Sequence, residues 1–502
     1  MNASSAPCGG STISASAPPS GAERQCLDGR DKGVRSRSYL SLAALVAAVA
    51  VAYSLYGLFR HWHFGSSAYD LGIFDQVVWH LSRFEVPSST IRGYTNMLGD
   101  HFSPIMVLLA PLYWVVPGPE TLIVAQAVLL ALSLIPVYLY AHRRLPRGAS
   151  FAITTAGALF WGMQRAAAFD FHEVAFAPLC IASAIFALDE RRWILFWASA
   201  LALIAVKEDL IPLIGGLGLV LAMRGDTRQA LIAVAVSCIG FVLVVGVLIP
   251  ALSDGGQFGY VSTYSAVIDA PWRIPLVMFA PLTKLRTMLL LLAPFLFLPL
   301  LSPLAILILP LAMERFLSST PNHWGTAFHY WAPLGPVLAM ASADGLVRVR
   351  TWLARRGMAG RTDRVVAACA GACLVLAAVL PGHQPLLRIV RPGHYQASLT
   401  DRTGHDVLAM IPQDAAVVAQ AAVVPHLSNR DRLFMLDATA PDADFVIVAR
   451  GLDPWPLSSF EEWAMLIESR RQRGYETVFD RDGWLVLRQT RVDGGGPNAL
   501  GP

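Results

Sequence analysis

Long apolar runs separated by short polar segments recur along residues 39–381. Runs of about 18 or more such residues are long enough to cross a bilayer as helices. Proline and glycine interrupt several runs, which favours broken or re-entrant segments where the backbone is buried or lines a cavity. We therefore predict a mainly α-helical, polytopic transmembrane bundle of about 11 to 13 spans over residues 39–381.

The first apolar run, residues 40–59, follows several basic residues between positions 24 and 37. Basic segments beside a membrane helix stay in the cytoplasm. This run is also longer than the apolar region of a cleaved signal peptide, which is about 7 to 15 residues. We predict a permanent first helix with a cytoplasmic N-terminus. The polar segment that follows, residues 61–104, is then an external loop.

Composition supports a membrane protein, with 55% hydrophobic and 15% charged residues. Soluble domains carry about 25% charged residues. The net charge is +4, and basic residues gather in short groups, such as residues 143–144, 191–192 and 348–364. Such groups are typical of cytoplasmic loops, so we expect no nucleic-acid partner. The six cysteines contain no Cys-x-x-Cys pair and predict no disulfide framework.

The two ends of the chain differ from the apolar middle. Residues 1–38 are rich in Ser, Ala, Gly and Pro and are predicted to be a disordered cytoplasmic tail. Residues 382–491 carry more charge and show a strand pattern at 443–449, a helical pattern at 459–473 and a hairpin signal at Asp482-Gly483. They predict a small α/β domain, placed outside because the basic residues 348–364 precede the last span. Residues 492–502 are predicted to be a flexible tail.

The loop of residues 61–104 holds three aspartates and four histidines among aromatic residues. Residues 71–84 have helical spacing, with Leu71, Phe74 and Val78 on one face, and could lie at the membrane interface. Asp70 precedes this helix directly. It could cap the helix, or it could be a general base at the membrane surface. Asp75 is expected to be a substrate-binding residue.

Further polar clusters interrupt the apolar runs. Ionisable residues at membrane depth are costly, so each cluster is a functional candidate. Helix caps and solvated loops between helices are the alternative interpretations. Carboxylates and imidazoles are also ligands for divalent metals, although no diagnostic spacing occurs. The candidate metal ligands are Asp100, His101, His172 and Glu173, and the other candidate substrate-binding residues are Lys207, Glu208 and Arg315.

An aromatic cluster near residues 323–331 contains His329 and Tyr330. Aromatic side chains often mark the membrane interface. The sharper hypothesis is that His329 and Tyr330 bind a sugar or a lipid headgroup. Arg315 could pair with Glu314 or face a phosphate, since guanidinium geometry suits this group, and Lys207 is the other candidate for neutralising a phosphate.

Four motifs resemble those of the DUF2079 family of bacterial multi-pass membrane proteins. They are Tyr-Asp-Leu-Gly-Ile-Phe-Asp-Gln at residues 69–76, Gly-Asp-His-Phe-Ser-Pro at 99–104, Phe-His-Glu at 171–173 and Lys-Glu-Asp at 207–209. The layout is similar to that of GT-C glycosyltransferases. By that resemblance, Asp70 matches the catalytic acidic residue of the first external loop. GT-C loops often carry two adjacent acidic residues, whereas this chain has Tyr-Asp-Leu.

The resemblance implies a GT-C-like glycosyltransferase in the bacterial inner membrane, with Asp70 as its base. Its partners would be membrane lipids and a polyprenyl-phosphate-linked sugar donor used at the outer face. The cofactor is open, with a divalent metal as the candidate. A transporter or lipid flippase and a non-catalytic membrane scaffold are the alternatives. Inverted repeats would favour transport, and the sequence shows no repeat.

Overall fold

A computed structural model describes residues 21–382 and 384–490. The protein is mainly helical, at 68%, with a small five-stranded sheet near the C-terminus. The predicted fold class is therefore confirmed. The longer helices before the sheet are α1 (Gly21–Trp62), α4 (Pro119–Leu132), α5 (Leu134–His142), α6 (Arg147–Leu159), α8 (Ala177–Asp189), α9 (Trp193–Val206), α10 (Ile211–Met223), α11 (Thr227–Leu243), α15 (Leu282–Leu292), α16 (Ile308–Leu317), α18 (Leu334–Arg355) and α19 (Thr362–Val379).

Further helices connect these elements. They are α2 (Ile73–Ser82), α3 (Ala110–Tyr113), α7 (Trp161–Ala168), α12 (Ile249–Leu252), α13 (Ser265–Ile268), α14 (Ile274–Phe279) and α17 (Pro321–Trp324). Helix α1 begins earlier than the predicted start of the first span at residue 39. Residues 1–20 of the predicted N-terminal tail and the predicted C-terminal tail lie outside the described residues.

Within the described residues, four helices are long and apolar enough to cross a membrane unbroken, or up to five if one bent pair counts as a span. The unbroken four are Ser38–Trp62, Pro119–His142, Thr227–Leu252 and Ala359–Val379. The count is lower than the predicted one because many apolar runs end early. Helix α9, for example, stops at Val206 before Lys207, and a proline follows at the second position of α10. These breaks place polar residues between apolar helices.

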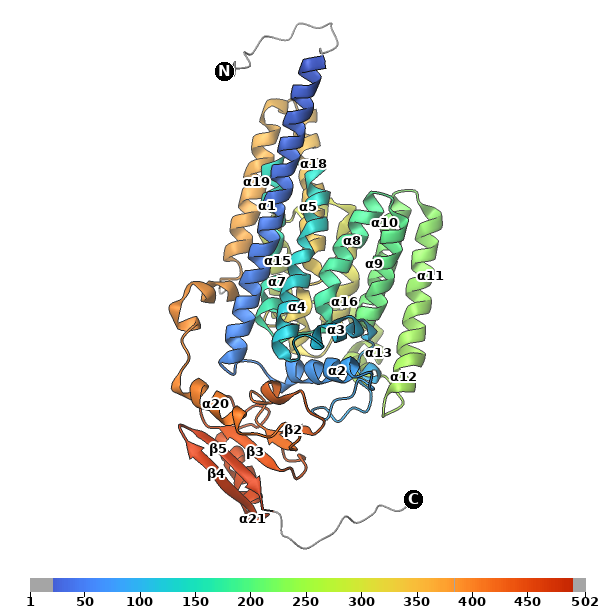
Figure 1. The fold of residues 1–502 in the computed structure, drawn as a ribbon. Coiled ribbons are helices and arrows are strands. Elements are labelled where there is room, and N and C mark those ends of the chain that lie inside the picture. Colours follow the sequence, from blue (N-terminus) through green and yellow to red (C-terminus); the bar gives the residue numbers. More distant parts are fainter. Residues whose placement is uncertain (1–20, 383, 491–502) are drawn as a thin grey trace, which may run out of the picture. The chain divides into compact units, whose positions relative to one another are not determined.

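The apolar helices differ in how much the protein covers them. Only 22% of the most apolar window of Thr227–Leu252 is buried, against 61% for Pro119–His142. Helix α11 packs beside α10 (Figure 1), and α19 packs beside α6. Exposed apolar side chains on α11 include Leu231, Ile239 and Val242. We interpret this exposed face as lipid-facing, since water would disfavour so large an apolar patch.

The C-terminal sheet has the strand order β2-β1-β3-β5-β4. Its strands are β1 (Val417–Ala419), β2 (Leu433–Met435), β3 (Phe445–Ala449), β4 (Tyr475–Arg481) and β5 (Trp484–Gln489), and its helices are α20 (Leu399–Ala409) and α21 (Phe460–Gln472). Strand β1 is parallel to β2 and β3, while β5 is antiparallel to β3 and β4. The predicted hairpin is present, with Asp482 and Gly483 at positive φ in the turn. The predicted strand and helix correspond to β3 and α21.

The two faces of the sheet belong to different hydrophobic clusters. Alternate side chains point to opposite faces of a strand. In β3, Val446 and Val448 pack with Trp463 and Ile467 of α21. The other face, with Ile447 and Ala449, forms one core with residues of the loop at 61–104, including Phe64, Ala68, Ile73, Val77 and Met97. The C-terminal domain and the early loop therefore share a core, although more than 300 residues separate them.

Helix α2 is buried on both sides as a result. Phe74 and Val78 belong to the core of the membrane helices, whereas Ile73 and Val77 belong to the core under the sheet. The predicted helix at 71–84 is confirmed. Asp75 lies on another face of this helix and is 0% exposed. Because loop residues are covered on two sides, the backbone that carries Asp70 is firmly positioned.

Candidate functional site

A cavity of about 350 Å³ lies among the loop at 61–104 and the breaks between apolar helices. The predicted site residues that line it share a polar or ionisable side chain and come from five separate segments. They are Asp70, Asp100, His101, His172, Glu173, Lys207, Glu208, His329 and Tyr330. Two predicted residues, Asp75 and Arg315, do not line it. The sequence-distant polar clusters thus converge on one cavity.

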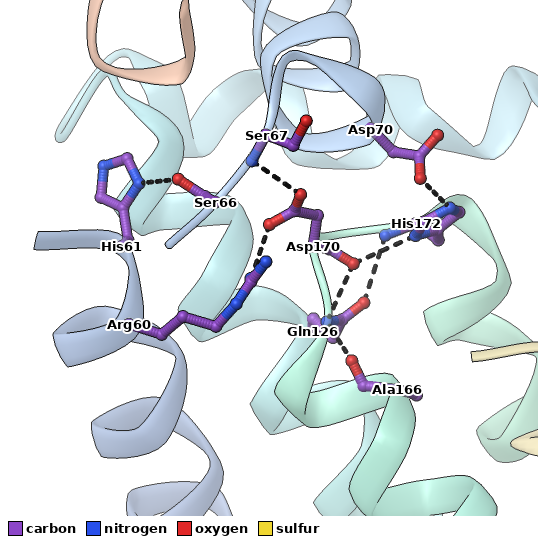
Figure 2. Close-up of polar contacts among 9 residues, drawn as sticks. All are labelled: Arg60, His61, Ser66, Ser67, Asp70, Gln126, Ala166, Asp170 and His172. Atoms are coloured by element: carbon purple, nitrogen blue, oxygen red, sulfur yellow. Dashed lines mark hydrogen bonds and ion pairs between the residues drawn. The ribbon is translucent and has the colours of Figure 1, made fainter. Parts of the chain in front are cut away.

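Asp70 lies in the short helix η1 (Ala68–Gly72) and contacts His172, which precedes η4 (Glu173–Phe176). The Asp70 Oδ2 atom is 2.7 Å from His172 Nε2 (Figure 2). Helix α2 has Gly72 at its N-cap position and no side-chain cap, so Asp70 does not cap that helix. The Asp70 side chain keeps 32% of its surface accessible, on the cavity. It is therefore paired and still reachable by a ligand.

The hydrogen bonds of His172 define its protonation. Its Nδ1 atom lies 3.0 Å from the main-chain oxygen of Asp170, to which it must donate. Burial lowers the pKa of His172, but the charge of Asp70 outweighs it and the pKa is raised. Burial likewise raises the pKa of Asp70, and the charge and hydrogen bond of His172 bring it below its usual value. The pair is thus a carboxylate with an imidazolium.

Asp170 supports this pair from behind. Its carboxylate accepts from Arg60 Nη1 at 2.7 Å and from the backbone N–H of Ser67 at 2.9 Å (Figure 2). Gln126 accepts from the backbone N–H of His172 at 3.2 Å. Arg60 belongs to α1, so this buried network joins the end of α1 to the segments that carry Asp70 and His172. Asp170 is a positioning residue, because it acts on the cavity through other residues.

Two further ion pairs line the cavity. Lys207 Nζ is 2.7 Å from Glu173 Oε1, and the Glu173 side chain is fully buried. His101 Nδ1 is 2.7 Å from Glu208 Oε1, while Glu208 Oε2 accepts from the backbone N–H of Phe102 at 3.0 Å. Lys207 and Glu208 lie at the break between α9 and α10, where η5 (Glu208–Leu210) begins. The broken helix therefore supplies both a cation and an anion.

Asp100 is held by two tyrosines. Its Oδ1 atom accepts from Tyr94 Oη at 3.0 Å and from Tyr260 Oη at 2.9 Å. The Tyr260 ring stacks on His101, with centroids 4.7 Å apart. Gly99 allows the loop to lie close to the end of α12, because a Cβ there would clash with the main-chain oxygen of Leu252. A side chain at position 99 would push the loop away from the end of α12.

His329 and Tyr330 reach the cavity from η12 (His329–Trp331). The His329 ring lies over His172, with centroids 3.5 Å apart, and contacts Tyr330. Burial and the charge of His172 hold the pKa of His329 well below its usual range. A neutral imidazole there forms an aromatic wall against the charged pair. This arrangement suits stacking on an uncharged ligand group.

Arg315 lies behind the cavity. It is 1% exposed, with Nη2 3.5 Å from Asp209 Oδ2 and its guanidinium over the ring of Trp331. Asp209 lines the cavity, and so does Glu314, whose Oε1 accepts from Tyr264 Oη at 2.6 Å. Arg315 therefore supports acidic groups of the wall, including Glu314, whose Oε2 lies 3.8 Å from Arg315 Nε, and its other predicted role, facing a phosphate, stays a prediction.

Asp75 points away from the cavity, toward the C-terminal domain. Its carboxylate accepts a hydrogen bond from Tyr113 and one of 2.7 Å from Ser428. The neighbouring Gln76 donates to the main-chain oxygen of Arg430 at 2.8 Å. Burial raises the pKa of Asp75 to about 7, although both hydrogen bonds oppose the rise. Asp75 is thus part of a buried contact between α2 and the C-terminal domain.

The raised pKa of Asp75 predicts a pH-dependent stability. The pKa of an aspartate in the unfolded chain is near 3.9, whereas burial raises the pKa of Asp75 in the folded protein to about 7. Between about pH 4 and pH 7, the folded protein still binds this proton while the unfolded chain has lost it. The free energy of unfolding therefore falls as pH rises through this range, by on the order of 1 kcal/mol per pH unit. We expect Asp75→Asn to remove this part of the slope. Thermal unfolding of both proteins between pH 5 and 8 measures it, and equal slopes would contradict the assignment.

The predicted metal ligands do not form one metal centre. Asp100, His101, His172 and Glu173 each bond a different protein partner. Among the described residues, the group whose three ligand atoms lie within 4.8 Å of one another is His80, Glu85 and Asp431, outside this cavity. Two of those three side chains are exposed. The cavity therefore fits an ion-pair network better than a metal site.

Several lining residues were not found from the sequence. Arg92 lies over the rings of Tyr69 and Tyr94. Tyr260 and Tyr264 come from a segment between apolar helices and bond acidic residues of the wall. Two tyrosines close together in a short polar interruption were the available signal. Arg92 is one of two arginines in the loop, and no motif marks it.

The family of this chain follows from a sequence model named "Predicted membrane protein (DUF2079)", which matches residues 60–486. The chain belongs to the DUF2079 family. A comparison with curated proteins finds no match. The family description and the apolar helices both indicate that this DUF2079 protein is a membrane protein.

Two solved structures share the fold of this DUF2079 protein. One is ArnT from Cupriavidus metallidurans bound to undecaprenyl phosphate, with 12% identity and a TM-score of 0.54 over 91% of this chain and 99% of that chain. The other is the same ArnT in the apo state, with 12% identity and a TM-score of 0.50 over 89% and 98%. These likenesses establish the fold, which agrees with the GT-C resemblance expected from the sequence.

Proposed function

We propose that this protein is an integral membrane glycosyltransferase that takes a sugar from a lipid-phosphate-linked donor. The observation that carries the proposal is the cavity where Asp70, His172, Glu173 and Lys207 meet. The shared fold supports it, since one of the similar structures is ArnT bound to undecaprenyl phosphate, a lipid phosphate. The cavity combines a reachable carboxylate with cations, as transfer from a phosphate leaving group requires.

In this proposal Asp70 accepts the proton of the acceptor hydroxyl as that oxygen attacks the anomeric carbon of the donor sugar. The bond between this carbon and the donor phosphate oxygen breaks, and the lipid phosphate leaves with the bonding electrons. His172 fixes the orientation of Asp70. Lys207 and Arg92 balance the charge of the leaving phosphate. His329 and Tyr330 provide the stacking wall for the sugar.

The proposed orientation places the N-terminus in the cytoplasm and the C-terminal domain outside, in the bacterial inner membrane. The basic segment 348–364 begins before the last span, Ala359–Val379, and overlaps its start. Basic residues at the end of a span favour the cytoplasmic side for that end. The loop at 61–104 follows the first span, Ser38–Trp62. The cavity would then open at the outer face, where lipid-linked sugars are presented.

The test is turnover of a lipid-linked sugar by the purified full chain in proteoliposomes. Polyprenyl-phosphate sugars with labelled sugar groups are supplied one at a time, with a mixture of acceptor lipids. We expect one donor to be consumed, and one free polyprenyl phosphate to be released for each sugar that is transferred. Transport of labelled donor across the vesicle without cleavage of the sugar–phosphate bond would instead identify a flippase and contradict the proposal.

A further inference from the structure

A second cavity, of about 430 Å³, shares none of the lining residues of the first cavity, although its lining residue Arg60 also bonds Asp170 behind that cavity. Five of its seven lining residues carry basic side chains, and the other two are glycines. The basic residues are Arg60, His63, Arg388, Arg391 and His394. Among the described residues, none of those that line it carries a carboxylate. A cavity with this lining favours an anion.

The charges of this basic cavity are largely uncompensated. In the described part of the chain, no carboxylate oxygen lies within 4.0 Å of Arg388 or Arg391, whereas Arg60 is paired with Asp170. Burial and the neighbouring His63 and Arg388 hold the pKa of His394 below its usual value. The arginines therefore carry the positive charge at neutral pH. Arg388 and Arg391 are exposed and free to bind a ligand, and guanidinium groups bind phosphate in a bidentate manner.

The position of the cavity relative to the apolar helices indicates the source of the anion. Arg60 and His63 lie at the end of the span Ser38–Trp62, and the arginines come from the segment just after the span Ala359–Val379. Two apolar runs thus end beside the cavity. The Tyr56 ring of α1 stacks on His394, one of the lining residues, with centroids 5.3 Å apart.

The segment that carries the arginines also exposes apolar side chains. It contains η14 (Pro385–Val390) and η15 (Pro392–His394). Leu387 is 51% exposed and Val390 is 76% exposed, each next to an arginine in the sequence. Exposed apolar residues that alternate with arginines are typical of a segment lying in the headgroup region of a bilayer.

We propose that this basic cavity binds the phosphate group of an anionic phospholipid headgroup. Leu387 and Val390 would contact the acyl chains while Arg388 and Arg391 bind the phosphate. The ligand chemistry, a phosphate anion, could also come from soluble phosphate, and the experiment separates the two sources. The proposal is independent of the sugar-transfer activity, because binding is measured without turnover.

The test uses the full chain purified in detergent and native mass spectrometry to count bound lipids. The variant Arg388→Gln/Arg391→Gln removes the two unpaired charges and leaves Arg60 and its contact with Asp170 in place. The control, Arg481→Gln/Arg488→Gln, removes two exposed arginines from β4 and β5. The probes are short-chain phosphatidylglycerol, the matching phosphatidylcholine, and inorganic phosphate.

We expect the wild type and the control to retain phosphatidylglycerol in preference to phosphatidylcholine. The arginine variant should bind phosphatidylglycerol about 30-fold more weakly, since each arginine beside an anionic lipid contributes a factor of about five. Unchanged phosphatidylglycerol binding by the variant would overturn the proposal. Displacement of the lipid by equimolar inorganic phosphate would also overturn it, because the site would then recognise soluble phosphate. Equal size-exclusion profiles ensure that all three proteins are folded.

Discussion

Replacing Asp70 by asparagine is expected to reduce sugar transfer about 10²- to 10⁴-fold, the usual contribution of a general base. The substitution keeps the shape of the side chain and removes the charge that accepts the proton. Asparagine can still contact His172, so the wall of the cavity should persist. Turnover of the donor identified in proteoliposomes measures the effect, and thermal unfolding checks that the variant is folded.

The matched control for this substitution is Asp254→Asn. Asp254 is an exposed aspartate whose carboxylate bonds Thr95, and it does not line the cavity. It should keep nearly full activity. A variant Asp70→Asn that retains more than about a tenth of wild-type turnover, well short of the usual effect of losing a base, would exclude Asp70 as the base. The proposed role of the cavity would then need another acceptor of the proton.

The second large effect is expected from Lys207→Met. Glu173 has no exposed side-chain surface, and Lys207 is its ion-pair partner among the described residues. Removing one partner of a buried pair leaves an uncompensated charge and costs about 3–5 kcal/mol. We expect a much lower midpoint of thermal unfolding and no detectable sugar transfer.

A double variant separates stability from activity at this pair. Lys207→Met/Glu173→Gln removes both charges, so the unfolding midpoint should return most of the way to the wild-type value. Activity should stay absent, because the cation proposed to balance the leaving phosphate is gone. A double variant as unstable as Lys207→Met would show that the two residues do not act as a pair. Recovered activity would remove Lys207 from the proposed mechanism.

The sequence was informative where polar residues interrupt apolar runs. Lys207-Glu208 and His172-Glu173 are costly in such surroundings, and both pairs line the cavity. Periodicity also predicted α2, α21 and the last hairpin, since these elements have regular patterns or a clear turn. Such elements can be predicted from the sequence because they depend on neighbouring residues and not on contacts between distant segments.

The sequence was uninformative where a role depends on long-range packing. Asp75 and Asp70 look alike in the motif, yet one faces the C-terminal domain and the other faces the cavity. The direction in which each side chain points depends on the local backbone conformation, and this conformation is determined by the tertiary fold. Arg315 also contacts Asp209, a partner that the sequence pattern does not predict. Arg92 lines the cavity because of the conformation of its loop, and sequence spacing does not predict that conformation.

The core shared by Phe64, Ile73 and Val77 with β3 and β5 has a consequence for biogenesis. Synthesis proceeds from the N-terminus, so the early loop emerges long before the strands that cover it. Its apolar side chains stay uncovered until the last fifth of the polypeptide has been translated and delivered to the same side of the bilayer. Ribosomes that stop short of β5 would release a chain whose first loop lacks its final layer, and such a product is a natural target for quality-control proteases.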